Sequence, residues 1–221
     1  MAGTITALVA QKKNPDRVNV YLDGKFAFGL AAIEAVRLRR GQLLSDSDIE
    51  RLQAADDVEQ AHEKALRFLS SRPRSEWEIR QNLRKAGYGD ETSERVLERL
   101  RSVALVDDAA FARYWIENRA QFKPRGSAAL RQELRRKGVA RDVIDEVLKE
   151  GEHDEDQAAL QAALAKANRY RQLPRPEFAQ KLGAYLVRRG FNYEISREAV
   201  NAAWQVVHAE EPSTHFEDLE E

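Results

Sequence analysis

The feature that most constrains this chain is a motif that occurs three times and ends in a glycine. Gly87, Gly138 and Gly190 are spaced 51 and 52 residues apart, and basic residues precede each of them. Apolar residues stand eight and four positions before each glycine, which places them on one face of a helix. Glycine after a helix is typical of the left-handed C′ position. The apolar residues are Ile79, Leu83, Leu130, Leu134, Leu182 and Leu186.

Further amphipathic segments precede and follow each of these helices, so the repeating unit is predicted to contain three helices. Prolines fall between the first and second helix of each unit, where a helix boundary is expected. Helices this short are not stable alone in water, so packing within and between units must stabilise them. The first helices are predicted at residues 62–70, 109–122 and 156–171, and the prolines are Pro73, Pro124, Pro174 and Pro176.

The first 30 residues follow a two-residue period instead. Apolar and polar residues alternate from Val18 to Asp23, and Asp23-Gly24 separates this run from Lys25-Phe26-Ala27-Phe28. An Asp-Gly pair between two such runs predicts a β-hairpin, because both turn positions need a positive φ. We expect a third strand at residues 4–9, a short helix at 30–39, and another at 49–54 that is capped within Ser45-Asp46-Ser47-Asp48.

The predicted fold is therefore mainly α, with three tandem three-helix repeats that form a curved array behind a small N-terminal domain containing a β-hairpin. A composition of 43% hydrophobic and 33% charged residues suits small helical units with narrow apolar stripes. The predicted segments are the N-terminal domain at 1–57, the repeats at 58–104, 105–151 and 152–208, and an acidic, disordered tail at 209–221.

Charge is distributed unevenly along the chain, although the net charge is only −1. Residues 58–150 carry 20 basic and 16 acidic side chains, whereas residues 151–221 carry 8 basic and 13 acidic ones. A basic middle beside an acidic end favours regional binding to a polyanion, and the alternative is that the charges serve solubility alone.

Cysteine is absent, which excludes disulfides, thiolate zinc sites and cysteine nucleophiles. No segment approaches the roughly 18 uncharged apolar residues of a membrane helix. We therefore expect a cytoplasmic protein that does not bind membranes. Nothing in the sequence calls for an oligomer, so a monomer is expected.

Catalytic motifs are missing from the sequence. It contains no P-loop, no G-x-G-x-x-G, no G-x-S-x-G and no H-E-x-x-H, and its four histidines are scattered. The carboxylate pairs Asp56-Asp57 and Asp107-Asp108 each precede a predicted helix, where aspartate caps exposed N–H groups, so we interpret them as caps. The sequence thus predicts a protein that is not an enzyme and holds no catalytic residue, metal or cofactor.

Basic residues supply the candidate binding site instead. Arg80 and Arg84 lie one helical turn apart in repeat 1, and repeat 2 has arginines at the matching positions, whereas repeat 3 has Gly183 and Val187. Such a stripe can bind phosphates or an acidic protein groove, and the alternative is a solvated face. The candidate residues are Arg80, Arg84, Lys85, Lys123, Arg125, Arg131, Arg135, Arg136, Lys137 and Arg188.

Two other features are candidate binding elements. Phe122-Lys123-Pro124-Arg125-Gly126 joins two helices with a basic, turn-forming segment, for which a functional role is as well supported as a structural one. Aromatic residues between basic ones, such as Tyr114 and Trp115, can stack on bases. At helical spacing they more often belong to a core, which we favour.

Several short motifs follow one another along residues 58–205. They are Arg72-Pro73-Arg74-Ser75, Arg84-Lys85-Ala86-Gly87-Tyr88, Leu105-Val106-Asp107-Asp108, Phe111-Ala112-Arg113, Lys123-Pro124-Arg125-Gly126 and Gln132-Glu133-Leu134-Arg135-Arg136-Lys137-Gly138-Val139. In order and spacing these motifs resemble the RecX family of RecA recombinase regulators. Residues 18–28 are similar to the β-containing extension of some members. No single motif is specific, and it is the combination that carries the resemblance.

The resemblance implies a regulator, chiefly an inhibitor, of RecA that acts in DNA recombination, DNA repair and the SOS response. Such a protein binds in the groove of the RecA filament on single-stranded DNA and limits filament growth, ATP hydrolysis, strand exchange and coprotease activity. The implied partner is the RecA nucleoprotein filament, with single- or double-stranded DNA as a further ligand. The alternative is a nucleic-acid-binding module that competes for DNA. Filament capping and groove coating both stay open.

Overall fold

The computed structural model describes residues 2–150 and 154–209, and the chain forms two compact units that divide between Asp107 and Asp108. The predicted acidic tail therefore lies, from residue 210 onward, outside the described residues. Within the described part of the chain, no helix combines the length and apolar character needed to cross a membrane.

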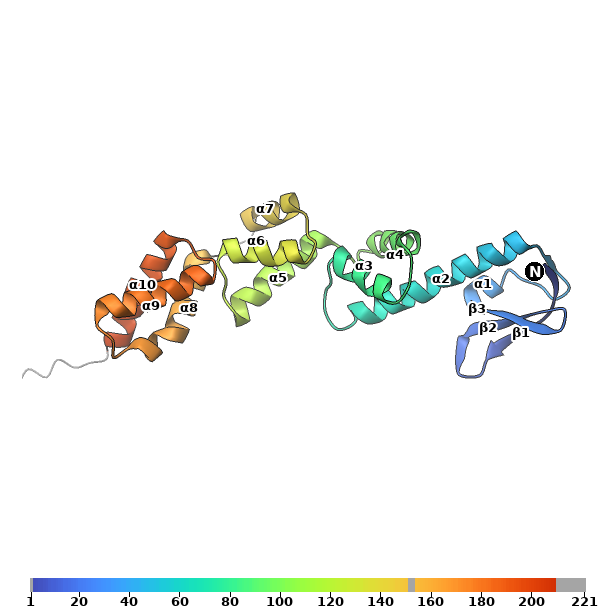
Figure 1. The fold of residues 1–221 in the computed structure, drawn as a ribbon, viewed down its shortest axis with the longest axis horizontal. Helices are drawn as coiled ribbons and strands as arrows, with labels where there is room; N and C mark the ends of the chain where they lie inside the picture. The colour runs from blue at the N-terminus through green and yellow to red at the C-terminus, as the bar shows by residue number, and fades with distance from the viewer. Residues whose placement is uncertain (1, 151–153, 210–221) are drawn as a thin grey trace, which may run out of the picture. The chain divides into compact units, whose positions relative to one another are not determined.

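The N-terminal residues form a four-stranded antiparallel sheet with the strand order β3-β2-β1-β4 (Figure 1). Asp23 and Gly24 have φ values of 46° and 81°, so the predicted hairpin between β2 and β3 is confirmed. The expected third strand is β1, and the two-residue β4 is too short to show a period in the sequence. The strands are β1 Gly3–Gln11, β2 Asn14–Leu22, β3 Lys25–Ala31 and β4 Leu43–Leu44.

The helix expected at residues 30–39 is much shorter than predicted. Helix α1 covers only Ala32–Ala35, because Leu30 and Ala31 still pair with β2 at the end of β3. Leu30 is fully buried in the core of the sheet.

Helix α2, Asp46–Leu69, is one continuous helix that runs from the sheet into repeat 1 (Figure 1). The prediction of two separate helices at 49–54 and 62–70 is wrong, because no glycine or proline stands between them and Val58 continues the buried stripe. Ser45 forms the expected capping box with Asp48. The predicted boundary at residue 57 falls inside this helix.

The interpretation of Asp56 as a helix cap is also wrong. Asp56 lies in the middle of α2 with 4% of its surface exposed. Its carboxylate accepts hydrogen bonds from both terminal nitrogens of Arg17 at 3.1 and 2.8 Å, from the Ala31 amide at 2.8 Å and from Gln60 at 2.7 Å. A buried carboxylate is stable only when paired in this way, so Asp56 ties β2 and β3 to α2.

The three helical repeats are confirmed, and each has its own buried cluster. The second part of α2 is the first helix of repeat 1 (Figure 1), and a short 3-10 helix, η1, extends the first helix of repeat 3. The remaining elements are α3 Glu76–Lys85, α4 Asp90–Ser102, α5 Asp108–Phe122, α6 Ser127–Arg136, α7 Arg141–Glu150, α8 Glu155–Ala167, η1 Asn168–Tyr170, α9 Arg175–Arg188 and α10 Tyr193–His208.

The second helix of each repeat ends in the predicted glycine turn. The three glycines have φ values of 93°, 80° and 88°. In repeat 1 the Tyr88 amide donates a hydrogen bond of 3.2 Å to the Leu83 carbonyl, and the residues at the same positions do so in repeats 2 and 3. This is the Schellman arrangement, which needs a left-handed residue and places the next side chain against the core. The repeats therefore share one helix ending.

Candidate partner-binding surface

Several exposed basic side chains of the candidate set lie close to the glycine turns. Arg84 and Lys85 in repeat 1, Arg136 in repeat 2 and Arg188 in repeat 3 are all exposed. Among the residues that the structure describes, none of these four has a carboxylate partner. Their positive charges stand at helix C-termini and interact favourably with the helix dipole, so these residues also stabilise the turns.

Arg80 and Arg131, by contrast, are engaged inside their own repeats. Arg80 pairs with Glu94 at 2.5 Å, and Arg131 pairs with Asp145 at 3.1 Å. Both pairs join the second helix of a repeat to the third with a spacing of 14 residues. The arginine hydrogen bonds lower the pKa of each carboxyl, so both acids stay ionised. These two arginines therefore brace the repeats and offer less free charge than the sequence predicts.

A cluster around Trp115 engages further candidate residues in repeat 2. Glu133 accepts hydrogen bonds from the Trp115 indole N–H at 2.9 Å and from Arg119 Nε at 2.7 Å. The Lys137 ammonium lies 4.9 Å from the centre of a Trp115 ring, in a cation–π arrangement. Arg125 Nε is 3.4 Å from a Glu133 oxygen, which makes an ion pair, yet this buried N–H has no hydrogen-bond acceptor in the described residues.

Two opposing effects act on the pKa of Glu133. Burial favours its neutral form, but the hydrogen bonds from Arg119 and Trp115, together with the charges of Arg119 and Arg125, outweigh burial and lower the pKa. Trp115 is thus part of an internal network with Arg119 and Glu133, as the preference for a core role predicted.

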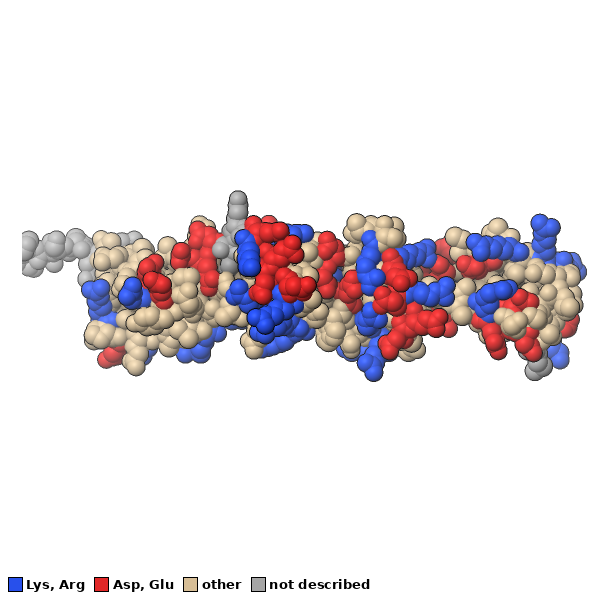
Figure 2. Space-filling model, turned by 90° about the horizontal axis from the view of Figure 1, so that it is seen from above, with Lys and Arg blue, Asp and Glu red and all other residues tan. Residues whose placement is uncertain are grey.

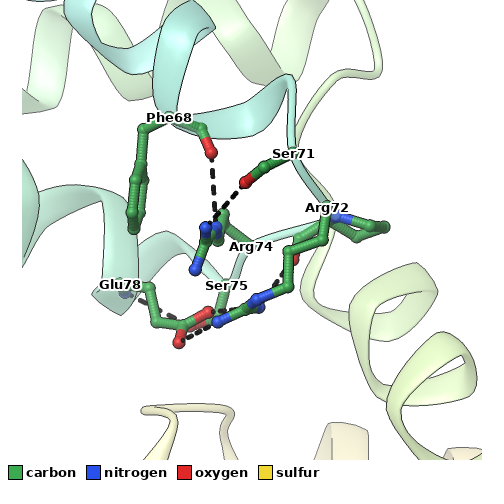
Figure 3. Close-up of polar contacts among 7 residues, drawn as sticks. Phe68, Ser71, Arg72, Arg74, Ser75 and Glu78 are labelled. Atoms are coloured by element: carbon green, nitrogen blue, oxygen red, sulfur yellow. Dashed lines mark hydrogen bonds and ion pairs between the residues drawn. The ribbon is translucent and has the colours of Figure 1, made fainter. Parts of the chain in front are cut away.

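The turn before α3 shows what the first basic-proline motif does. Arg72 donates two hydrogen bonds to the Glu78 carboxylate, at 2.9 and 3.1 Å, and Arg74 packs 3.9 Å from the centre of the Phe68 ring (Figure 3). Ser75 caps α3 by accepting a hydrogen bond from the Glu78 amide. In repeat 1 this motif therefore stabilises a turn, and its positive charges are engaged in contacts within the repeat.

The matching turn of repeat 2 is built differently. Lys123 stands where repeat 1 has Arg72, and Ala129 stands where repeat 1 has Glu78. Lys123 thus lacks the internal carboxylate and is exposed without an ion pair among the described residues. Phe122 beside it has 66% of its surface exposed. The charge of Lys123 and the face of Phe122 are both available to a partner.

The same turn forms a close joint with repeat 3. The Gly126 amide donates a hydrogen bond of 3.0 Å to the Arg189 carbonyl, and Arg189 Nη1 donates one of 2.9 Å to the Pro124 carbonyl. A Cβ on Gly126 would lie 2.2 Å from the Gly190 oxygen, so only glycine permits this approach. Gly190 therefore lies in the turn that ends α9 and also packs against the turn of repeat 2.

Glu155 of α8 closes the joint from the other side. Its carboxylate accepts hydrogen bonds from the Ser127 amide at 3.0 Å and from the Ser127 hydroxyl. Because Gly126 offers no side chain, a carboxylate from repeat 3 takes the capping role at the start of α6. Glu155 and Arg189 were missed by sequence reasoning, since nothing local marks a contact between residues this far apart in the chain.

The joint brings together candidate residues from two repeats. Lys123 immediately precedes Pro124, and Arg188 immediately precedes Arg189, so both residues adjoin this contact in the chain. Arg135 and Arg136 follow at the far end of α6, where Arg135 Nε donates a hydrogen bond of 3.3 Å to the Arg131 carbonyl. Figure 2 shows basic side chains gathered over repeat 2 beside a group of acidic ones. We call Lys123, Arg135, Arg136 and Arg188 the free-cation surface.

Four family profiles match the chain in order. They are "Regulatory protein RecX N-terminal domain" over residues 3–44 and the first, second and third three-helix domains of RecX over 61–100, 107–148 and 154–200. These ranges follow the sheet and the three repeats.

Full-length relatives and solved structures agree with the profiles. A regulatory protein RecX of Bacillus licheniformis is 33% identical over 199 residues, which cover 89% of this chain and 76% of the relative. One of Levilactobacillus brevis is 37% identical over 195 residues, covering 87% and 73%. A crystal structure of regulatory protein RecX superposes with a TM-score of 0.74 at 30% identity, covering 90% of this chain and 99% of that one. RecX from Lactobacillus salivarius, at 20% identity and a TM-score of 0.60, covers 67% and 97% and shares the fold. The chain belongs to the RecX family of regulatory proteins.

Proposed function

We propose that this chain regulates the RecA recombinase in the cytoplasm, chiefly as an inhibitor. In this proposal it binds in the groove of the RecA filament on single-stranded DNA and limits filament growth, and with it ATP hydrolysis, strand exchange and coprotease activity. It acts by binding and performs no catalysis of its own. Membership of the RecX family supports the regulatory role.

The observation that carries the binding mode is the division of the basic residues into paired and free ones. Arg80, Arg125 and Arg131 face carboxylates within their own repeats, whereas the free-cation surface has none among the described residues. Unpaired cations on a rigid scaffold can meet a partner's carboxylates or phosphates without first giving up an internal ion pair. A protein groove and bound DNA both offer such groups.

Competition for naked DNA is the second candidate, and one observation favours it. Phe122 is largely exposed next to Lys123, and an aromatic face beside a cation is the combination on which single-stranded bases stack. Binding to naked DNA through its phosphates falls steeply with salt concentration, so a steep salt dependence of naked-DNA binding would support this candidate.

The test is the single-stranded-DNA-dependent ATP hydrolysis of RecA, measured while this protein is titrated in with DNA in excess. Filament regulation predicts a fall in the rate at substoichiometric protein, because each bound molecule then affects many RecA protomers. Competition for DNA predicts instead that the protein needed for inhibition rises in proportion to added DNA. An unchanged rate at equimolar protein contradicts the RecA proposal itself.

A further inference from the structure

Repeat 3 lacks the ion pair that joins the second and third helices of the other two repeats. Gly183 stands at the position of Arg80 and Arg131, and Arg197 stands at the position of Glu94 and Asp145. The cation has thus moved to the opposite helix, and the carboxylate that would pair with it is gone. Arg197 is exposed and has no carboxylate partner among the residues described in the structure.

A cleft of about 330 Å³ lies between α9 and α10 where that ion pair is missing. Gly183 forms part of its wall, and a Cβ there would meet no atom of the described residues within 4 Å. Val187 and Tyr193 line the cleft with 55% and 76% of their surfaces exposed, and Arg197 lines it as well. The cleft therefore combines exposed apolar surface with one unpaired cation.

We propose that this cleft binds a segment of the chain itself, residues 214–220. That segment has the sequence Thr-His-Phe-Glu-Asp-Leu-Glu, in which Glu217 and Asp218 stand between Phe216 and Leu219. An apolar side chain from it occupies the space beside Gly183 and Val187, and a neighbouring carboxylate pairs with Arg197. The segment thereby supplies the acidic partner that repeats 1 and 2 carry within their own third helix.

The chain is long enough to make this contact. From Arg197 to the end of α10 at His208 is roughly 17 Å along the helix axis, at about 1.5 Å per residue. The eight residues from His208 to Phe216 can span up to about 27 Å when extended, at about 3.4 Å per residue. Phe216 can therefore return along α10 to the cleft with chain to spare.

Tethering makes even a weak contact effective. A segment joined to its site by a short linker is present at an effective concentration on the order of millimolar, so modest affinity suffices to fill the cleft. The same modest affinity leaves it displaceable by an acidic, apolar segment of another protein. This inference does not depend on the identity of the partner and holds or fails separately from the RecA proposal.

Disulfide trapping in the full chain tests the contact, because the chain has no native cysteine. Asn201 lines the cleft on α10, and Thr214 opens the proposed segment, so the double variant Asn201→Cys, Thr214→Cys places one thiol on each. Disulfides form only when the two Cα atoms come within about 7 Å. We expect rapid intramolecular trapping at low protein concentration, read as a mobility shift on a non-reducing gel.

Further substitutions in this background separate docking from mere proximity. Phe216→Ser with Leu219→Ser changes only residues outside the described elements, so it leaves the repeats folded, and it should slow trapping several-fold. Arg197→Glu should slow it similarly, whereas the matched charge change Arg175→Glu, at the far end of α9, should not. Equal rates in all of these variants would overturn the proposal. Trapping that yields mainly covalent dimers, at a rate proportional to protein concentration, would overturn it in favour of a second copy as the occupant.

Discussion

Asp56 shows how much one residue contributes to the N-terminal unit. Its carboxylate receives hydrogen bonds from Arg17 on β2, from the Ala31 amide on β3 and from Gln60 on its own helix. The sequence does not reveal this role, because Arg17 is 39 residues away and an Asp-Asp pair before an apolar stretch is typical of a helix start. Local sequence patterns therefore predict the Asp23-Gly24 turn but do not predict the pairing of Asp56 with Arg17.

We predict that Asp56→Ala lowers the free energy of unfolding by about 3 kcal/mol, because removing one member of a buried ion pair leaves the other charge and a backbone amide without partners. Urea unfolding followed by circular dichroism measures this change. The neighbouring Asp57 is exposed, so Asp57→Ala should change stability by less than about 0.5 kcal/mol. Equal effects of the two substitutions would show that the network around Asp56 contributes no stability.

The lowered pKa of Glu133 predicts a dependence of stability on pH. The pairing of Glu133 with Arg119 and Trp115 stabilises the folded state fully above the ordinary carboxyl pKa of 4.5, and this contribution is lost as pH falls through the lower folded value. Glu133→Gln should therefore be less stable than the native chain at pH 7, and the difference should shrink below pH 4.5. A difference that stays constant down to pH 3 would contradict the assignment.

At the scale of the elements, the three glycine turns and the three-helix repeats could be predicted because they depend on local signals. Apolar residues one turn apart and a glycine in a left-handed conformation are written within about ten residues of sequence. The extent of α2 and the joint between repeats 2 and 3 could not be predicted from the sequence, because each depends on contacts between distant segments. The 14-residue spacing that joins Arg80 to Glu94 and Arg131 to Asp145 was a signal in the sequence that could have identified these arginines as paired.

The joint between repeats 2 and 3 leads to a prediction with an internal control. Gly126→Ala would place a Cβ 2.2 Å from the Gly190 oxygen, so the two turns must separate and thermal stability should fall. Gly183→Ala changes the same atoms inside a helix, where the Cβ meets no atom of the described residues within 4 Å, and should raise stability by up to about 1 kcal/mol through the higher helix propensity of alanine. Equal melting temperatures for the two variants would contradict the close approach at Gly126.

At the scale of the whole molecule, acidic and basic residues are nearly equal in number, yet the basic residues fall into two groups. Many arginines join helices within a repeat, and a smaller group has no carboxylate partner among the described residues. The sequence predicts where the basic residues stand, because helical periodicity fixes their faces. It does not predict which of them are neutralised, because the neutralising carboxylates lie on other helices.

We propose that the free-cation surface carries the regulatory interaction, and a variant with reversed charges on this surface shows whether it does. The test variant combines Lys123→Glu, Arg136→Glu and Arg188→Glu. A control variant combines Lys12→Glu, Lys25→Glu and Arg37→Glu. For both variants we would measure the inhibition of RecA ATP hydrolysis on single-stranded DNA. All six residues are exposed, and both variants change the net charge equally. We predict that the first variant stays folded, with a slightly lower melting temperature because two of its new carboxylates stand at helix C-termini, and that it loses inhibition by at least about tenfold, an interaction loss of about 1.4 kcal/mol or more, while the control inhibits like the native chain. Equal inhibition by both folded variants would contradict the claim.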